Sequence, residues 1–140
     1  MKRFALAALV VALTAVCAFG AVQDFGKFTL DIPTGWTATQ DGSTVGIVKD
    51  DNTASMSITI DSTEGAALKD IAEELSKELS GTKPEADSDG NYSFDFMNQN
   101  DVNSHCIITA EEGEYALLVL TGSENAPDDM TAILGSFKMK

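Results

Sequence analysis

The chain has 140 residues, which is enough for one domain rather than two because domains cluster around ~100–150 residues. Its 22 acidic residues exceed its 9 basic residues, giving a net charge of −13. This excess argues against a nucleic-acid partner, since no basic surface is present to neutralise phosphates. One histidine and two cysteines leave almost no material for histidine catalysis, a zinc cluster or a disulfide framework.

Residues 1–20 have the pattern of a signal peptide. Lys2 and Arg3 form a positive start, and the segment Phe4–Phe19 is apolar except for Thr14. Small residues before the next segment predict cleavage after Gly20. The apolar run of sixteen residues is shorter than the ~20 that a membrane-spanning helix needs. We therefore expect export to the periplasm or out of the cell, with no stable membrane anchor after cleavage.

Cys17 raises the alternative of a lipid-modified N-terminus. Lipoprotein signals usually carry Leu three residues before the cysteine and a small residue directly before it, whereas Thr14 and Val16 stand there. A structural cysteine in an apolar segment is the favoured interpretation.

The remaining segment, 21–140, is expected to be one domain with Cys106 as its single cysteine. Seven lysines oppose all 22 acidic residues there, a net charge of −15.

Four strands are predicted before the first helix. Apolar and polar residues alternate with period two, which is typical of strands with one buried face. The segments are Phe28–Ile32, a short strand from Trp36 through Ala38, Val45–Val48 and Met56–Ile60. Asp41-Gly42 predicts a tight hairpin between the second and third, because glycine accepts the positive φ of primed turns.

The period then changes to 3.6, which predicts an amphipathic helix. The apolar stripe consists of Leu68, Ile71, Ala72, Leu75 and Leu79. We expect Ser62 or Thr63 to cap the start of this helix and Gly81 to follow its end.

Three further strands and a second helix complete the domain. The strands are Tyr92–Phe96, His105–Ala110 and Tyr115–Thr121. The last has apolar residues on both faces, which predicts a central position covered on both sides. Ser123 or Asn125 is expected to cap the second helix, with Pro127 in its first turn. Its apolar stripe consists of Met130, Ile133, Leu134 and Phe137.

Short hairpin connections imply antiparallel pairing, so the predicted fold class is α+β. We expect an antiparallel sheet of about six to seven strands, with two flanking helices covering its apolar face.

The segments GKFTLDIPTGW (Gly26–Trp36), SMSITI (Ser55–Ile60) and ILGSFKMK (Ile133–Lys140) resemble small exported bacterial proteins of the PsbP/Mog/DcrB-like fold group. The resemblance implies an antiparallel sheet flanked by helices. Members of that group include an extrinsic subunit of photosystem II, a Ran-binding nuclear-transport factor and many proteins without known activity.

The segment Glu85–Asn91 is the most suggestive chemical motif. Its acids at alternate positions, followed by Gly90, resemble the first half of a calcium loop. The twelfth position, which should be a bidentate glutamate, is Phe96, and a strand follows instead of a helix. A solvated turn is favoured, and a calcium-responsive module using Asp87–Asn91 is the alternative.

Other candidate groups have simpler structural explanations. His105 and Cys106 are adjacent, but consecutive side chains on a strand point to opposite faces and cannot form a catalytic dyad. We expect Cys106 in the core and His105 at the surface. The remaining candidates are the aromatic residues Trp36, Tyr92, Phe94 and Phe96 for an apolar groove, the loop residues Asn98, Asn100 and Asn103 for a polar ligand, and the acidic pairs Asp50/Asp51, Glu111/Glu112 and Asp128/Asp129. Core packing, turn formation and helix-dipole complementarity explain these groups without a site.

The sequence thus favours a non-enzymatic, exported binding or accessory protein, with no assigned catalytic, cofactor or metal residues. The acidic surface predicts a basic protein partner or cations. A carboxylate-based enzyme stays open beside the calcium-responsive module, because carboxylates converge only in three dimensions. The specific partner and the oligomeric state are left open.

Overall fold

The computed structural model describes residues 21–140. The predicted signal peptide, its cleavage after Gly20 and the lipid-modified alternative at Cys17 lie outside these residues and stay predictions. Within 21–140, no helix has the length and apolar character needed to cross a bilayer. The elements in chain order are β1 (Ala21–Asp24), β2 (Phe28–Ile32), β3 (Trp36–Asp41), β4 (Thr44–Lys49), β5 (Ser55–Ser62), α2 (Leu68–Glu78), β6 (Glu85–Ala86), β7 (Tyr92–Met97), β8 (Asn103–Glu111), β9 (Glu114–Thr121), the 3₁₀ helix η1 (Ser123–Asn125), α3 (Pro127–Ser136) and β10 (Lys138–Met139).

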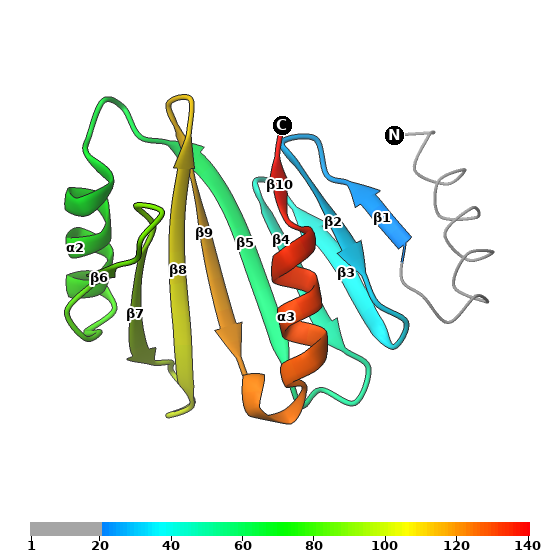
Figure 1. Cartoon of the computed structure of the whole chain (residues 1–140). Helices are drawn as coiled ribbons and strands as arrows, with labels where there is room; N and C mark the ends of the chain where they lie inside the picture. The colour runs from blue at the N-terminus through cyan, green and yellow to red at the C-terminus, as the bar shows by residue number, and fades with distance from the viewer. Residues whose placement is uncertain (1–20) are drawn as a thin grey trace.

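Seven strands form an antiparallel sheet in the order β3-β4-β5-β9-β8-β7-β6 (Figure 1). β9 lies at its centre, pairing with β5 from Ser55↔Thr121 to Ser62↔Glu114 and with β8 on its other side. This confirms the α+β fold class and the central position predicted for β9. The Asp41-Gly42 hairpin is also confirmed, since Asp41 pairs with Thr44 and Gly42 has φ +64°.

The strand Phe28–Ile32 belongs to a second, three-stranded sheet, so the expectation of a single sheet is wrong. β2 pairs with β1 on one side and with β10 on the other, in the order β1-β2-β10. The sequence did not predict β1 or β10, because strands of four and two residues are too short to show alternation. β10 also reaches β2 from more than 100 residues away, and no local pattern encodes that pairing.

The two helices cover opposite faces of the seven-stranded sheet, so the expectation that both cover one apolar face is wrong. α3 and the three-stranded sheet pack on the face that carries Leu118 of β9. α2 packs on the other face, over β7 and β8, where Leu117 of β9 points. Successive residues of a strand point to opposite faces, and β9 is apolar on both. The larger core contains Phe28, Leu30, Ile32, Trp36, Val45, Ile47, Ala54, Met56, Ile58, Ile60, Ala116, Leu118, Leu120, Ala126, Met130 and Ile133, and the smaller core contains Ala72, Phe94, Cys106 and Ile108.

The start of α2 differs from the predicted cap. Ala67 occupies the N-cap position and makes no side-chain cap hydrogen bond. Ser62 is instead the last residue of β5, and the Thr63 N–H donates to the Gly113 carbonyl oxygen at 2.9 Å. Pairing of β5 with β9 extends the strand through the expected cap, so the helix begins only after a further loop.

The end of α2 is closed by a Schellman motif centred on Ser80. Ser80 has φ +56°, its N–H donates to the Lys77 carbonyl, and the Gly81 N–H donates to the Ser76 carbonyl at 2.7 Å. The left-handed residue is thus Ser80 and not Gly81. Glycine is needed at 81 for another reason, because a Cβ there would lie 2.7 Å from Cδ1 of Phe94 on β7.

The start of α3 also lacks the predicted side-chain cap. Ser123 and Asn125 belong to η1, and Ala126 is the N-cap residue of α3. Pro127 stands in the first turn as predicted. Asp129, also in that turn, accepts a hydrogen bond from Trp36 Nε1–H at 2.9 Å, which ties α3 to β3.

Candidate functional site

A groove of about 300 Å³ separates α2 from the adjoining ends of β5 and β9. On α2, four residues spaced three and four apart share the face that borders it. They are Ile71, Glu74, Leu75 and Glu78, and the opposite wall consists of Asp61, Ser62, Thr63, Glu64, Ala66 and Tyr115. We call this hollow the Tyr115 groove.

The loop between β5 and α2 holds the acidic wall in place. The Thr63 N–H and hydroxyl both donate to the Gly113 carbonyl oxygen, at 2.9 and 3.2 Å, which fixes the loop against the turn between β8 and β9. The Glu64 N–H donates to Ser62 Oγ at 3.1 Å. Asp61, Glu64 and Tyr115 are therefore positioned by hydrogen-bonded backbone rather than by a free loop.

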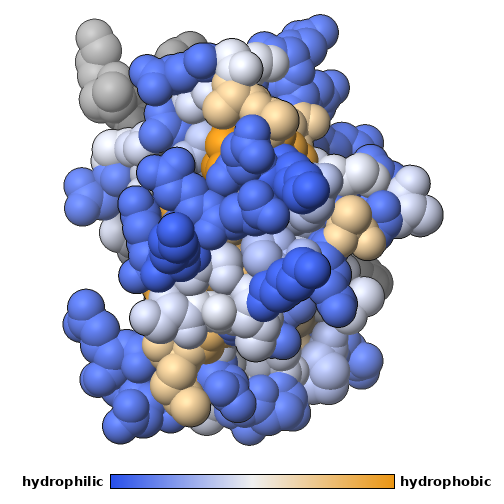
Figure 2. All heavy atoms as spheres, turned by 90° about the vertical axis from the view of Figure 1, so that its left-hand side faces the viewer, coloured by the Kyte–Doolittle hydropathy of each residue, from blue (hydrophilic) through white to orange (hydrophobic). Residues whose placement is uncertain are grey.

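The Tyr115 groove concentrates negative charge around one aromatic ring. The pKa of Tyr115 is raised by burial and then by the carboxylates of Asp61, Glu74, Glu78 and Glu64. Within residues 21–140, none of these four carboxylates forms an ion pair with a lysine. The side of the molecule that carries α2 is mostly hydrophilic, with small apolar areas between (Figure 2).

This arrangement suits an organic cation. The face of a tyrosine ring attracts ammonium and guanidinium groups, and nearby carboxylates add Coulomb attraction. Half-buried Ile71 and Leu75 offer apolar surface for the aliphatic stem of a lysine or arginine. In the described part of the chain, no three His, Cys, Asp or Glu side chains are arranged to hold a metal ion.

The segment Glu85–Asn91 forms the hairpin between β6 and β7. Asp87 Oδ1 accepts hydrogen bonds from the Asp89 N–H at 2.8 Å and the Asn91 N–H at 3.0 Å. The backbone N–H groups, that of Asn91 foremost, lower the pKa of Asp87. This carboxylate thus stabilises its own turn, as the solvated-turn interpretation expects. The calcium-responsive alternative at Asp87–Asn91 stays a prediction.

The structure separates His105 from Cys106, as predicted. Cys106 is fully buried beneath α2, and burial raises the pKa of its thiol to about 12. His105 faces the other side of the sheet, where Nδ1 lies 2.7 Å from Asp95 Oδ1 on the neighbouring strand. A thiol held protonated and facing away from the histidine cannot serve as a nucleophile activated by it.

The other sequence candidates are structural. Trp36 lies in the larger core, whereas Tyr92, Phe94 and Phe96 belong to the smaller one, so the aromatic residues share no groove. Asn98 Oδ1 accepts from the backbone N–H groups of Asn100 and Val102, at 2.8 and 3.1 Å, as a turn residue does. Asn103 begins β8.

The acidic pairs lie in turns, at a strand end or in the first turn of a helix. Hydrogen bonds from Thr53 and Lys49 lower the pKa of Asp51 to about 2, which holds this turn carboxylate as an anion. Glu111 ends β8 and Glu112 lies in the turn that follows, while Asp128 and Asp129 lie in the first turn of α3. Sequence reasoning missed the Tyr115 groove, because the acids around it come from β5, a loop and α2. The only local signal was the spacing of Glu74 and Glu78 on one helix face.

Comparisons with known proteins bear on the fold. No family model matches the sequence, and no curated protein matches it. The solution structure of cyanobacterial PsbP (CyanoP) from Synechocystis sp. PCC 6803 is similar with a TM-score of 0.60 and 13% identity, covering 88% of this chain and 94% of that chain. A crystal structure from Bacteroides thetaiotaomicron VPI-5482 has a TM-score of 0.53 and 14% identity, over 88% of this chain and 49% of that chain. This chain spans about half the length of the Bacteroides protein. The chain therefore has a PsbP-like α+β fold, as the sequence resemblance implied, and these similarities extend to the fold alone.

Proposed function

We propose that this is an exported, non-enzymatic accessory protein that binds a cationic segment of a partner protein in the Tyr115 groove. The observation that carries the proposal is the gathering of Asp61, Glu64, Glu74 and Glu78 around Tyr115 without a neutralising lysine among residues 21–140. Four uncompensated carboxylates repel one another, and a bound ammonium or guanidinium group relieves that repulsion.

Further support comes from the composition of the domain. Its net charge of −15 favours encounter with a basic surface and disfavours an acidic one. The PsbP-like fold agrees with an accessory role, since the family resemblance includes an extrinsic subunit that works on a larger assembly. The separation of His105 from Cys106 supports a role without nucleophilic catalysis.

A labelled decalysine peptide provides a direct test in a fluorescence anisotropy titration. The double variant Glu74→Gln/Glu78→Gln should weaken binding by about 5-fold to 30-fold, because each exposed charge contributes roughly 0.5–1 kcal/mol. Asp101→Asn/Glu124→Gln removes the same charge at the opposite ends of β8 and β9, and should change the affinity less than 2-fold. Equal losses in both double variants would show that net charge alone, and not the groove, attracts the peptide.

Export has its own test. Mass spectrometry of the protein isolated from its native envelope should find an N-terminus at Ala21, as cleavage after Gly20 predicts. The protein should then be periplasmic or secreted without a membrane anchor. A diacylglycerol adduct on Cys17, or an uncleaved chain beginning at Met1, would contradict this part of the proposal.

A further inference from the structure

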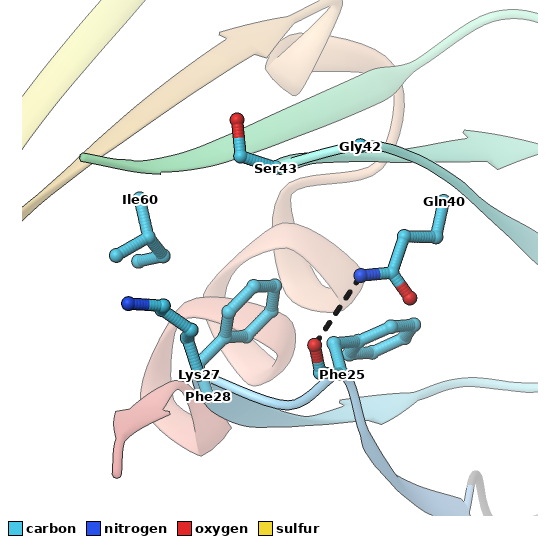
Figure 3. Close-up of a pocket in the computed structure, with 7 residues that line it drawn as sticks. All are labelled: Phe25, Lys27, Phe28, Gln40, Gly42, Ser43 and Ile60. Carbon is cyan, nitrogen blue, oxygen red and sulfur yellow. Dashed lines mark hydrogen bonds between the residues drawn. The ribbon is translucent and has the colours of Figure 1, made fainter.

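A second hollow, of about 260 Å³, lies on the opposite face of the sheet from the Tyr115 groove. It separates the β1–β2 turn from the β3–β4 hairpin and the end of β5. Its lining consists of Phe25, Lys27, Phe28, Gln40, Gly42, Ser43 and Ile60 (Figure 3). We call it the Phe25 slot, and we propose that it binds a small amphipathic anion, with an apolar planar body and one carboxylate head.

The floor of the Phe25 slot is apolar and firmly supported. Phe28 and Ile60 are 2% and 5% exposed and belong to the larger core. The ring of half-buried Phe25 stacks on Phe28 with centroids 5.2 Å apart. The Phe28 ring centroid in turn lies 5.4 Å from that of Phe137, the residue that follows α3. A planar apolar group entering here gains both buried area and a ring to stack on.

The rim of the slot presents hydrogen-bond donors. Lys27 borders it on the side of Ile60, and Gln40 borders it on the side of Phe25 (Figure 3). Gln40 Nε2 donates to the Phe25 carbonyl oxygen at 3.3 Å, a long hydrogen bond that leaves its second N–H for a ligand. An ammonium and an amide N–H select a ligand head that accepts hydrogen bonds.

Three lysines lie near the β1–β2 turn at this corner of a strongly acidic domain. Lys138 lies in β10, which pairs with β2, and Lys140 follows that strand. The Lys140 N–H donates to the Lys27 carbonyl oxygen at 2.9 Å. Three of the seven lysines in 21–140 therefore surround the β1–β2 turn. Lys27 forms an ion pair with Glu114 and Lys140 forms one with Asp24, whereas Lys138 has no ion-pair partner among the described residues. The carboxylate of a ligand in the slot would replace that of Glu114 on Lys27.

The volume sets the size of the ligand. A space of about 260 Å³ equals roughly nine water molecules at the ~30 Å³ each occupies in the liquid. One ring with a short acidic arm fits such a space. The Phe25 slot is separate from the Tyr115 groove, for which we propose a cationic ligand, because the two lie on opposite faces of the sheet.

Titration with 3-phenylpropionate, followed in ¹H–¹⁵N NMR spectra, tests this inference. Saturable shifts should appear at the amides of Phe25, Lys27 and Gly42, and the uncharged 3-phenylpropanamide should bind at least 2-fold more weakly. Equal binding of acid and amide would overturn the assignment of an anion site. Absence of saturable shifts, or shifts centred on Tyr115, would overturn the site itself.

Two variants should move the affinity in opposite directions. Lys27→Met keeps the aliphatic stem and should weaken binding of the acid about 2-fold to 5-fold, the usual range for an exposed ion pair. Glu114→Gln removes the competing carboxylate and should strengthen it by a similar factor. Lys83→Met, beside β6 at the opposite edge of the seven-stranded sheet, is the charge-matched control and should change nothing. Gln40→Glu, at an exposed position, should also weaken binding. An unchanged affinity in the Lys27, Glu114 and Gln40 variants would refute the proposal.

Discussion

Gly122, which connects β9 to η1, is the position where an added methyl group should do the most damage. Its φ of +72° is left-handed, and a Cβ would lie 2.2 Å from the Thr53 carbonyl oxygen. That oxygen also accepts a hydrogen bond from Asn125 Nδ2 at 2.8 Å, which joins the β4–β5 turn to η1. Gly122→Ala therefore strains the backbone and pushes the two connections apart.

The cost of Gly122→Ala can be assembled from three contributions. The left-handed conformation costs about 1 kcal/mol for alanine. The Thr53 oxygen must retreat from 2.2 Å to at least 3.0 Å from the new Cβ, which as overpacking costs about 1–3 kcal/mol. Weakening the hydrogen bond from Asn125 adds about 0.5–1 kcal/mol. The free energy of unfolding should fall by about 2.5–5 kcal/mol in total.

Urea unfolding monitored by fluorescence of Trp36, the single tryptophan, measures this loss. Gly113→Ala is the matched control, because Gly113 has φ +85° but no atom within 4 Å of an added Cβ. The control should lose only about 1 kcal/mol, the conformational part. If both variants lose the same free energy, the close approach of Gly122 to Thr53 does not exist and the reasoning is refuted.

Two further predictions concern buried polar groups. Burial raises the pKa of Cys106 from its ordinary value of 9.0 to about 12. As the pH rises, the unfolded chain therefore loses the thiol proton before the folded chain does. The free energy of unfolding should consequently fall between pH 9 and 12, by at most about 4 kcal/mol. Urea titrations at alkaline pH should show this decline in the wild type but not in Cys106→Ala. Rapid labelling of native Cys106 by a thiol reagent at pH 7 would contradict its burial. Asp129→Ala leaves the Trp36 indole N–H without its acceptor and should cost about 1–3 kcal/mol in the same unfolding assay, whereas a loss below 0.5 kcal/mol would show that water replaces the carboxylate.

Periodicity predicted the elements whose burial is local, and failed where pairing is distant. β5 and α2 each present a regular apolar pattern, and both form close to where the pattern places them. The three-stranded sheet has no such signal, because β1 and β10 are stabilised by β2 and not by their own sequences. The helix caps failed for a related reason, since pairing with β9 takes Ser62 into β5.

The candidate site depended still more on tertiary structure. Glu74 and Glu78 are one helical turn apart and visible as a pair, but nothing in the sequence brings Asp61 or Tyr115 to them. That meeting follows from the pairing of Asp61 with Tyr115 across β5 and β9, more than fifty residues apart along the chain. The motifs that sequence did single out, such as Asp87 and Asn98, are turn residues with the same composition as ligand loops.

Among residues 21–140, the seven-stranded sheet divides the interior unequally, with sixteen buried hydrophobic residues on one side and four beneath α2. Segments held by little buried area open at a lower free energy than the whole domain. Amide hydrogens of α2 should thus exchange with deuterium through a partial opening, while those of β5 and β9 wait for global unfolding. The Tyr115 groove is lined by α2 on one side and by β5 and β9 on the other. A ligand bound there would contact both the helix and the central strands, and should slow amide exchange throughout α2.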